Sequence, residues 1–427
     1  MTDKLFMMRK KMTGFPSLLK ADEALSMLLE KIDFRELRVE RVPLEACLGR
    51  YCGEDVRSPV NVPAFDRSAM DGYAVRAEDT FGASPTNPVT LELVGVSHAG
   101  MTLDETPKIS PGQTVEIYTG GPIPAGADAV VMAENVKKTS DGFIEVYRQV
   151  YPFQNVSRVG EDFAEGELVV AKGIRIRPWH IGALASLNIT HIPVYVKLRI
   201  AVLSTGSELV ELGQQPRKGQ IINSSKPMLK ALITELGCEP VDLGTAEDSI
   251  DTVSAMIREG LRTADMVIVT GGTSVGERDI VPEAVNKLGK PGVIFHGVRV
   301  RPAKPTGAAV IDGKPVFMLS GFPVSALLGF VLFVEPVVNT FYWRQPQIPC
   351  TVRGKLSRRV ANPSLSKAFV RVFVRKTDEG YVVEPLMLTG SGLLSTLTKA
   401  NGILVVPEDV EGFDEGDIVE VHLLKQD

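Results

Sequence analysis

Residues 271–276 read Gly-Gly-Thr-Ser-Val-Gly, a run that combines glycines with hydroxyl side chains. The apolar run 266–269 precedes it, and a helix is expected to begin near Val281 with Pro282 in its first turn. Glycines let backbone N–H groups approach a phosphate closely, and hydroxyls near the positive end of a helix add donors. The run therefore predicts a phosphate-binding loop, and the alternative is a plain glycine-rich turn.

Two further loops also combine glycine with hydroxyl side chains. Residues 204–208 read Ser-Thr-Gly-Ser-Glu after an apolar run, and residues 320–325 read Ser-Gly-Phe-Pro-Val-Ser between a strand-like run and a helix. Parallel strands bring such loops to one edge of a sheet, where open α/β domains bind ligands. The residues expected to contact the ligand are Ser204, Thr205, Gly206, Gly271, Gly272, Thr273, Ser274, Gly276, Ser320, Pro323 and Ser325.

Positive charge follows a later strand in residues 298–305. This segment carries Arg299, Arg301 and Lys304, and Pro302 and Pro305 stiffen it. A solvated charge run is the alternative, but the fixed loop favours an oxyanion site.

Three acidic residues neighbour these loops: Glu208, Asp248 and Asp279. Their carboxylates are of the kind that can hold Mg²⁺ or polarise water. The structural alternatives are that Asp248 caps the helix expected at Ile250 and that Glu208 lies in solvent.

These loops need a central α/β domain, which we place at residues 197–342. Short apolar runs alternate there with amphipathic helices, a pattern that predicts a mostly parallel sheet covered on both faces. The runs 308–311 and 316–319, joined through Asp312-Gly313, predict a hairpin. An amphipathic helix is expected from Ser17 to Leu29, short β runs between 59 and 151, and a small β-barrel or sandwich after Pro346.

Composition narrows the class of protein. A chain of 427 residues with 44% hydrophobic and 23% charged residues is expected to fold into two to four domains. The net charge of -5 argues against general binding to nucleic acid or anionic lipid. Four scattered cysteines and five unpaired histidines favour a cytoplasmic protein without a zinc site. The longest apolar stretch, 327–334, is followed by Glu335 and Pro336, so no membrane span is expected.

The segment 68–74, Ser-Ala-Met-Asp-Gly-Tyr-Ala, resembles the SxMDGYA signature of molybdopterin molybdenumtransferases, the MoeA family, which includes the C-terminal region of gephyrin. The similarity continues in the family's order through segments 118–120, 160–162, 203–209, 271–279 and 301–305. In the signature, turn chemistry explains Asp71-Gly72 only. Met70, Tyr73 and Ala74 are therefore expected to shape a contact surface.

The resemblance implies a multidomain α/β plus β fold: a discontinuous, elongated domain (17–59 and 152–196), an inserted β domain (60–151), the α/β domain (197–342) and a C-terminal β-barrel-like domain (343–427). It also implies insertion of molybdate into adenylylated molybdopterin, which releases AMP and molybdenum cofactor with a divalent cation assisting. Glu208, Asp248 and Asp279 match acidic positions of the family. Asp71, Thr119 and Asp162 also match family positions. In a homodimer, these positions reach the active site of the partner subunit, and Asp71 is expected to act there as a catalytic residue.

Two other functions are compatible with the motifs. One is a molybdopterin adenylyltransferase, whose fold is essentially the α/β domain alone; the other is a non-catalytic scaffold that binds the cofactor or a protein. The adenylyltransferase that supplies the substrate is the expected protein partner. This chain departs from the family where many relatives have Pro-Gly-Asn-Pro at 320–323, and it carries Arg301 where lysine is common.

Overall fold

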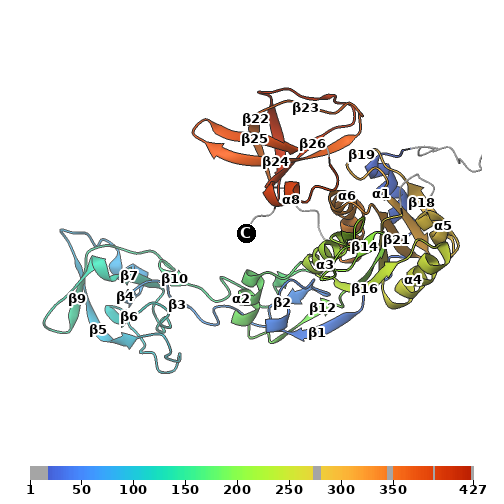
Figure 1. The fold of residues 1–427 in the computed structure, drawn as a ribbon. Coiled ribbons are helices and arrows are strands. Elements are labelled where there is room, and N and C mark those ends of the chain that lie inside the picture. The colour runs from blue at the N-terminus through green and yellow to red at the C-terminus, as the bar shows by residue number, and fades with distance from the viewer. Residues whose placement is uncertain (1–17, 273–279, 344–349, 388–389, 425–427) are drawn as a thin grey trace, which may run out of the picture. The chain divides into compact units, whose positions relative to one another are not determined.

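The computed structural model describes residues 18–272, 280–343, 350–387 and 390–424 (Figure 1). They form two compact units, Met1–Val39 with Tyr195–Asp427 and Glu40–Val194. The multidomain α/β plus β fold is present, while the division into four domains at the boundaries given above remains a prediction.

The first unit is built on a six-stranded sheet with the strand order β16-β13-β17-β21-β20-β18. β16, β13, β17 and β21 pair with one another in parallel, whereas β20 is antiparallel to both of its neighbours, β21 and β18. The mostly parallel sheet is therefore confirmed. The strands are β13 (Arg199–Thr205), β16 (Glu239–Ala246), β17 (Met266–Thr270), β18 (Pro291–His296), β20 (Gly307–Ile311) and β21 (Lys314–Leu319).

Helices cover both faces of this sheet. Alternate strand residues such as Leu203 and Val269 pack against Val253 and Ile257 of α4 and Val281 of α5 in one aliphatic core. α3 and α6 contact each other and pack on the sheet apart from that core (Figure 1). The helices are α1 (Ala21–Leu29), α3 (Ser225–Glu235), α4 (Ile250–Thr263), α5 (Ile280–Asn286), α6 (Pro323–Gly329) and α7 (Glu335–Phe341).

The predicted hairpin joins β20 to β21. Asp312 and Gly313 have φ angles of 50° and 80°, the positive values that a two-residue type I′ turn requires. The turn chemistry legible in the sequence therefore fixes this antiparallel pair in an otherwise parallel sheet.

A continuous helix runs over Pro323–Phe341, with a π-helical segment at Phe330–Val334 between α6 and α7. Glu335 and Pro336, which follow the apolar stretch 327–334, are the first two residues of α7, and the proline is tolerated there because the local hydrogen-bonding pattern already changes. By length and composition this 19-residue helix is apolar enough to cross a membrane, but 56% of its most apolar window is buried inside the protein, as in a core helix.

The C-terminal part of this unit is a closed barrel, because β24 pairs with both β25 and β26. Its core is aliphatic, with Val372, Val406 and Val421 fully buried. The strands are β22 (Thr351–Leu356), β24 (Lys367–Thr377), β25 (Gly380–Met387), β26 (Gly402–Val406) and β28 (Ile418–Leu423). The short strand β19 (Val300–Arg301) pairs with β24 in parallel, and this pairing connects the preceding domain to the barrel.

The second unit contains a six-stranded sheet with the order β7-β4-β6-β5-β9-β8. Three small two-stranded sheets and helix α2 (Pro178–Ser186) complete this unit. The sheet strands are β4 (Gly72–Val75), β5 (Val89–Ser97), β6 (Gln113–Ile117), β7 (Ala129–Met132), β8 (Val136–Lys138) and β9 (Phe143–Val146).

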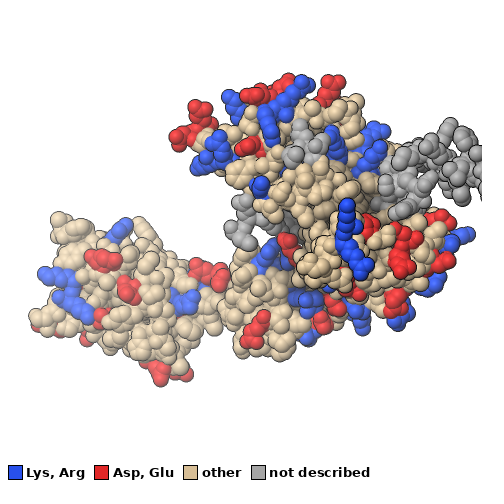
Figure 2. All heavy atoms as spheres, in the orientation of Figure 1, with Lys and Arg blue, Asp and Glu red and all other residues tan. Residues whose placement is uncertain are grey.

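Charges are mixed over the surface. On the face shown in Figure 2, Lys and Arg side chains alternate with Asp and Glu side chains, and the described residues form no continuous basic surface there. On this face, an anion-binding site would have to come from a local group of residues.

Candidate active site

The three glycine-containing loops meet at the carboxyl edge of the parallel strands. A Cβ on Gly271 would lie 2.2 Å from the carbonyl oxygen of Thr205, and a Cβ on Gly321 would lie 3.5 Å from the Cα of Gly271. Gly271 and Gly272 also have φ angles of 86° and 59°. A side chain is thus excluded at Gly271, and the three loops approach one another closely at the edge where an open α/β domain binds its ligand.

Hydroxyl side chains lie just beneath this surface. Ser204 is 0% exposed and Thr205 is 2% exposed, so neither offers much area for direct contact with a ligand. Thr205 Oγ1 has no hydrogen-bond partner among the described residues. A buried hydroxyl without a partner costs free energy, and a bound ligand oxygen or water beside it would offset that cost.

Two carboxylates flank the first loop. Asp248 Oδ2 accepts a hydrogen bond from the Ser207 amide at 3.4 Å, and both carboxylate oxygens of Glu208 lie 2.9 Å from where a Cβ on Gly206 would stand. Asp248 does not cap α4, because Ser249 does so by accepting from the Thr252 amide at 3.5 Å. Both carboxylates are exposed and line the same loop.

Four of the predicted residues, Thr273, Ser274, Gly276 and Asp279, lie outside the described residues. The helix expected after them is present as α5, which begins at Ile280.

Arg301 and Lys304 belong to a tightly folded segment. The Val298 amide donates to the Lys304 carbonyl at 2.9 Å, and the Thr306 amide donates to the Ala303 carbonyl at 3.1 Å. Arg301 is half-buried and Lys304 is exposed. The two charges are thus carried on a backbone fixed by its own hydrogen bonds, as the two prolines led us to expect.

Both cations line a cavity of about 510 Å³ between this segment and the barrel, called the polar cavity below for its cations and serines, although apolar residues such as Pro305 and Phe322 also line it. Ser320 and Ser325 of the third loop line it as well, although they are only 6% and 3% exposed. Pro323, the first residue of α6, is buried beside them. The barrel side of the lining consists of Ser364, Ser366, Arg371, Gly390 and Ser391.

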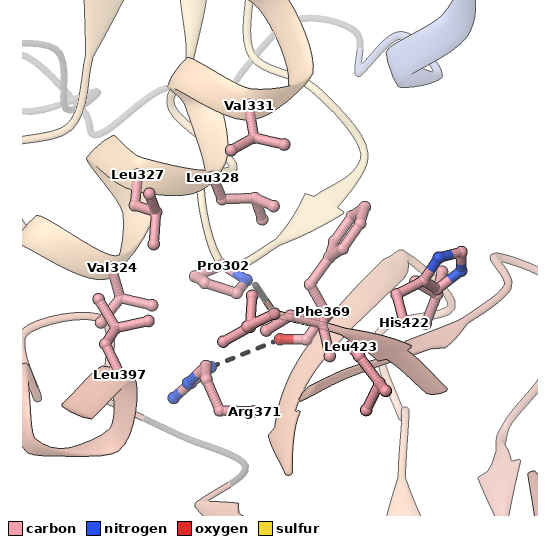
Figure 3. Close-up of a pocket in the computed structure, with 13 residues that line it drawn as sticks. Pro302, Val324, Leu327, Leu328, Val331, Phe369, Arg371, Leu397, His422 and Leu423 are labelled. Atoms are coloured by element: carbon pink, nitrogen blue, oxygen red, sulfur yellow. Dashed lines mark hydrogen bonds between the residues drawn. The ribbon is translucent and has the colours of Figure 1, made fainter. Parts of the chain in front are cut away.

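Arg371 is a residue that the sequence analysis missed. Its guanidinium is buried, with Nε donating to Thr396 Oγ1 at 3.2 Å. Nη1 donates to the Phe369 carbonyl at 3.5 Å (Figure 3). Nη2 has no partner among the described residues. Burial, together with the nearby charge of Arg301, lowers the pKa of this guanidinium, but arginine stays protonated at physiological pH. A buried cation with an unused donor is well suited to bind an anion.

A second cavity, of about 350 Å³, shares the wall formed by Pro302 and Arg371. Its other residues are almost all apolar, and in Figure 3 Val324, Leu327 and Leu328 extend from the helix toward the barrel residues. His422 and Arg371 are the ionisable residues in this lining, and we assign the chemistry to the polar cavity and the glycine loops, where several cations and hydroxyls gather.

The second unit brings Asp71 and Thr119 together. Asp71 Oδ1 accepts from the Thr119 amide at 2.7 Å and from Thr119 Oγ1 at 2.8 Å. These two hydrogen bonds lower the pKa of the Asp71 carboxyl, which is fully exposed. Asp71 is therefore held as an oriented, ionised carboxylate at the surface.

The neighbours of Asp71 in the signature have mostly structural roles. A Cβ on Gly72 would lie 2.0 Å from the Val131 carbonyl oxygen, so only glycine fits in this strand. Tyr73 and Ala74 are 6% and 0% exposed in the core of the β domain. The expected contact surface is therefore wrong for Tyr73 and Ala74, because they are inside, and only Met70, 43% exposed, remains available.

Asp162 lies in a segment that runs beside the signature segment. Its amide donates to the Val62 carbonyl at 3.0 Å, and β10 (Val156–Ser157) pairs with β3 (Arg67–Ser68). The side chain of Asp162 is exposed. The sequence-distant segments that carry Asp71, Thr119 and Asp162 are thus neighbours in this unit.

Three family models together match most of the chain. They are the MoeA N-terminal region (domain I and II) at residues 19–188, a probable molybdopterin binding domain at 201–340, and the MoeA C-terminal region (domain IV) at 353–424.

Whole-length relatives agree with these matches. A Methanocaldococcus jannaschii protein named for molybdopterin biosynthesis is 40% identical, with 93% of this chain and 97% of the relative covered. The molybdopterin molybdenumtransferase of Haemophilus influenzae is 35% identical, with 95% and 100% covered. A crystal structure of the molybdopterin biosynthesis moeA protein from Pyrococcus horikoshii OT3 has a TM-score of 0.82 at 32% identity and covers 96% of this chain and 100% of its own. Motifs, fold and whole-length similarity together show that this chain belongs to the MoeA family of molybdopterin molybdenumtransferases.

Proposed function

We propose that this chain inserts molybdate into adenylylated molybdopterin, with release of AMP and molybdenum cofactor, as a transferase of molybdenum cofactor biosynthesis. The observation that carries the proposal is the polar cavity lined by Arg301, Lys304 and Arg371 together with serine hydroxyls. Molybdate is a small tetrahedral dianion whose oxygens only accept hydrogen bonds. A cavity that combines three cations with hydroxyl donors supplies what such an ion needs.

The glycine loops are assigned to the phosphates of the pterin nucleotide. The segment 320–325 supports this arrangement because Gly321 adjoins Gly271 while Ser320 and Ser325 line the polar cavity. Phosphate and molybdate would therefore be held by neighbouring parts of one surface. Cleaving the pyrophosphate linkage requires its charge to be balanced and the leaving AMP to be positioned, and these loops and cations serve both needs.

A divalent cation, Mg²⁺, is the cofactor that the family implies. Glu208 and Asp248 provide carboxylate oxygens at one loop, which is the donor type that Mg²⁺ prefers, although no group of three or more candidate ligands occurs among the described residues. We assign Asp248 and Asp279 as its ligands. When bound, the cation would neutralise charge on the phosphate oxygens.

We further propose a homodimer with a shared active site, in which Asp71, Thr119 and Asp162 serve the site of the other subunit. Asp71, held ionised by Thr119, is the catalytic member of this group. The adenylyltransferase that makes the substrate is the proposed partner protein. The four free cysteines are compatible with action in the reducing cytoplasm.

The test is a molybdate-dependent assay of AMP release and cofactor formation, with purified protein, adenylylated molybdopterin, molybdate and Mg²⁺. Wild-type protein should release AMP only when molybdate is present. Arg371→Ala should lose most of this activity, whereas Arg375→Ala, an exposed arginine on the same strand, should keep it. AMP release that ignores molybdate, or equal rates for the two variants, would contradict the assignment of the cavity.

A further inference from the structure

A small group of polar side chains is buried directly beneath the glycine loops. Ser204, Thr270 and Asn223 are 0%, 2% and 3% exposed. Ser204 and Thr270 are partners in the register of β13 and β17, and the residue that follows Thr270 is Gly271. The core further down these strands is aliphatic. The change from aliphatic to polar side chains thus comes at the last residues before the loops begin.

Asn223 connects this group to helix α3. Its Nδ2 donates to Ser204 Oγ at 2.9 Å, and its Oδ1 accepts from the Lys226 amide at 3.2 Å. Thr270 Oγ1 is also bonded to Ser204 Oγ, at 3.2 Å. Since the Lys226 amide can only donate, the Asn223 oxygen must face it and the amide nitrogen must face Ser204. The Asn223 side chain therefore joins the end of β13 to the start of α3, and Ser204 extends this connection to Thr270 at the end of β17.

Ser225 and Lys226, at the start of α3, make bonds to other segments of the same surface. Ser225 Oγ donates to the Gly321 carbonyl at 2.9 Å, which ties the third loop to α3. Lys226, 5% exposed, pairs through Nζ with Glu211 Oε1 at 2.7 Å. Glu211 lies in the segment of chain that follows Gly206, and this segment also carries Glu208. The start of α3 is thus bonded to the third loop and to the chain that follows the first loop, while Asn223, just before it, is bonded to the first loop.

Buried polar groups of this kind are costly unless each hydrogen bond is made, and a made network holds its members in one geometry. Aliphatic side chains would fill the same space without fixing the strand ends in this way. Because Asn223 and Ser204 are buried, they act on a ligand only through the loops they hold.

We propose that Asn223 is a positioning residue, which keeps the ends of β13 and β17 aligned so that the amides of the glycine loops meet the phosphates of the substrate. This inference rests on the proposed function for its kinetic consequence, whereas its structural consequence, the ordering of the loops, does not depend on that function.

Two variants separate this role from simple helix capping. Asn223→Ser retains an oxygen that can cap α3 by accepting from the Lys226 amide, but its shorter side chain does not reach Ser204. Asn223→Ala loses both contacts. Asn401→Ser is the matched control, because Asn401 makes a comparable pair of bonds to the Val374 amide and carbonyl within the barrel, at 2.6 and 2.7 Å.

For Asn223→Ser we expect a nearly unchanged Tm and about a tenfold lower kcat/KM for the pterin nucleotide, which corresponds to the loss of one buried hydrogen bond. Hydrogen–deuterium exchange should become faster in peptides covering 203–208 and 268–272. Asn223→Ala should show the same two changes together with a lower Tm. In a double-mutant cycle with Ser204→Ala, the double variant should be no worse than the worse single variant.

The proposal is overturned if Asn223→Ser keeps wild-type exchange in both loop peptides, or if the losses of the two single variants multiply in the double variant. Asn401→Ser should leave loop exchange and kcat/KM unchanged; an equal effect there would mean that any weakened fold produces the result. If the wild-type protein itself shows no molybdate-dependent activity, the proposed function fails, and the exchange measurement still decides the role of Asn223.

Discussion

Asp71 shows how an exposed side chain can be kept ready for chemistry without burial. Two donors of Thr119 converge on one oxygen of its carboxylate and lower the pKa of the group. A depressed pKa in the folded state means that the ionised form is favoured by folding. The resulting contribution to stability is present above the unfolded-state pKa and is lost as the pH falls through the folded-state value.

Replacing Thr119 by valine should therefore raise the pKa of Asp71, because the hydroxyl donor is removed while the backbone donor remains. Carbon-detected NMR titration of the Asp71 carboxyl would measure the shift directly. Thr139→Val is a suitable control, since the Thr139 hydroxyl bonds only to the Phe143 carbonyl in the same unit. An unchanged Asp71 titration in Thr119→Val would mean that the hydroxyl has no influence on the carboxylate.

Lys304→Ala should raise the molybdate concentration for half-maximal rate by roughly ten- to a hundredfold, the equivalent of ~1.5–3 kcal/mol for a hydrogen bond to a charged group. The KM for the pterin nucleotide should change much less, because the glycine loops stay intact. Steady-state kinetics with each substrate varied in turn would separate the two. Lys290→Ala, an exposed lysine of the same unit, should leave both values unchanged. A selective loss of pterin affinity would place Lys304 at the other ligand.

Arg371 marks the limit of what the sequence could predict at the scale of single residues. It alternates with the buried Val370 and Val372, so the pattern places it on the face of the strand opposite the barrel core. A lone arginine on that face is normally solvated. Only the tertiary structure shows that this face is covered, because the covering residues lie some 70 positions earlier along the chain, around Arg301.

The helices and strands were easier to predict from the sequence than the residues that line the site. β26 and β28 have the bounds that their alternating residues predict, and the Asp312-Gly313 turn fixes the hairpin. β19 was not predicted, because a two-residue strand has too few residues to show a period and exists only through its pairing with β24. The π-helical segment was missed for a related reason, since its residues are as apolar as those of an ordinary helix.

At the scale of an element, Gly72→Ala should destabilise the β domain by about 1–3 kcal/mol, the range usual for overpacking a core, because the new Cβ would collide with the Val131 carbonyl of the adjacent strand. Urea unfolding followed by near-ultraviolet circular dichroism would report the loss. Gly182→Ala gives a matched control of opposite sign: Gly182 lies in α2 with open space at its Cβ, and alanine should stabilise that helix by up to ~1 kcal/mol. Equal stabilities for the two variants would contradict the close approach of β4 and β7.

At the scale of the whole molecule, the shared-site proposal makes a quantitative prediction about mixed dimers. Asp71→Ala and Asp248→Ala should each be inactive alone, yet regain roughly a quarter of wild-type activity when mixed and allowed to exchange subunits. About half of the dimers would then be mixed, and each mixed dimer would carry one intact site of two. Native mass spectrometry would count the mixed dimers, and the assay of AMP release would measure the rate. If mixed dimers form and the rate stays at the level of the separate variants, the site belongs to one chain.

The wall that Pro302 and Arg371 form between the two cavities has a consequence for inhibitor design. A tetrahedral oxyanion in the polar cavity and an apolar fragment in the neighbouring cavity would be separated only by these two side chains. A short linker that passes them would join a weak anion mimic to a lipophilic group with a cavity of about 350 Å³ to fill. Such a compound would combine burial of apolar surface in one cavity with charge-assisted hydrogen bonds in the other.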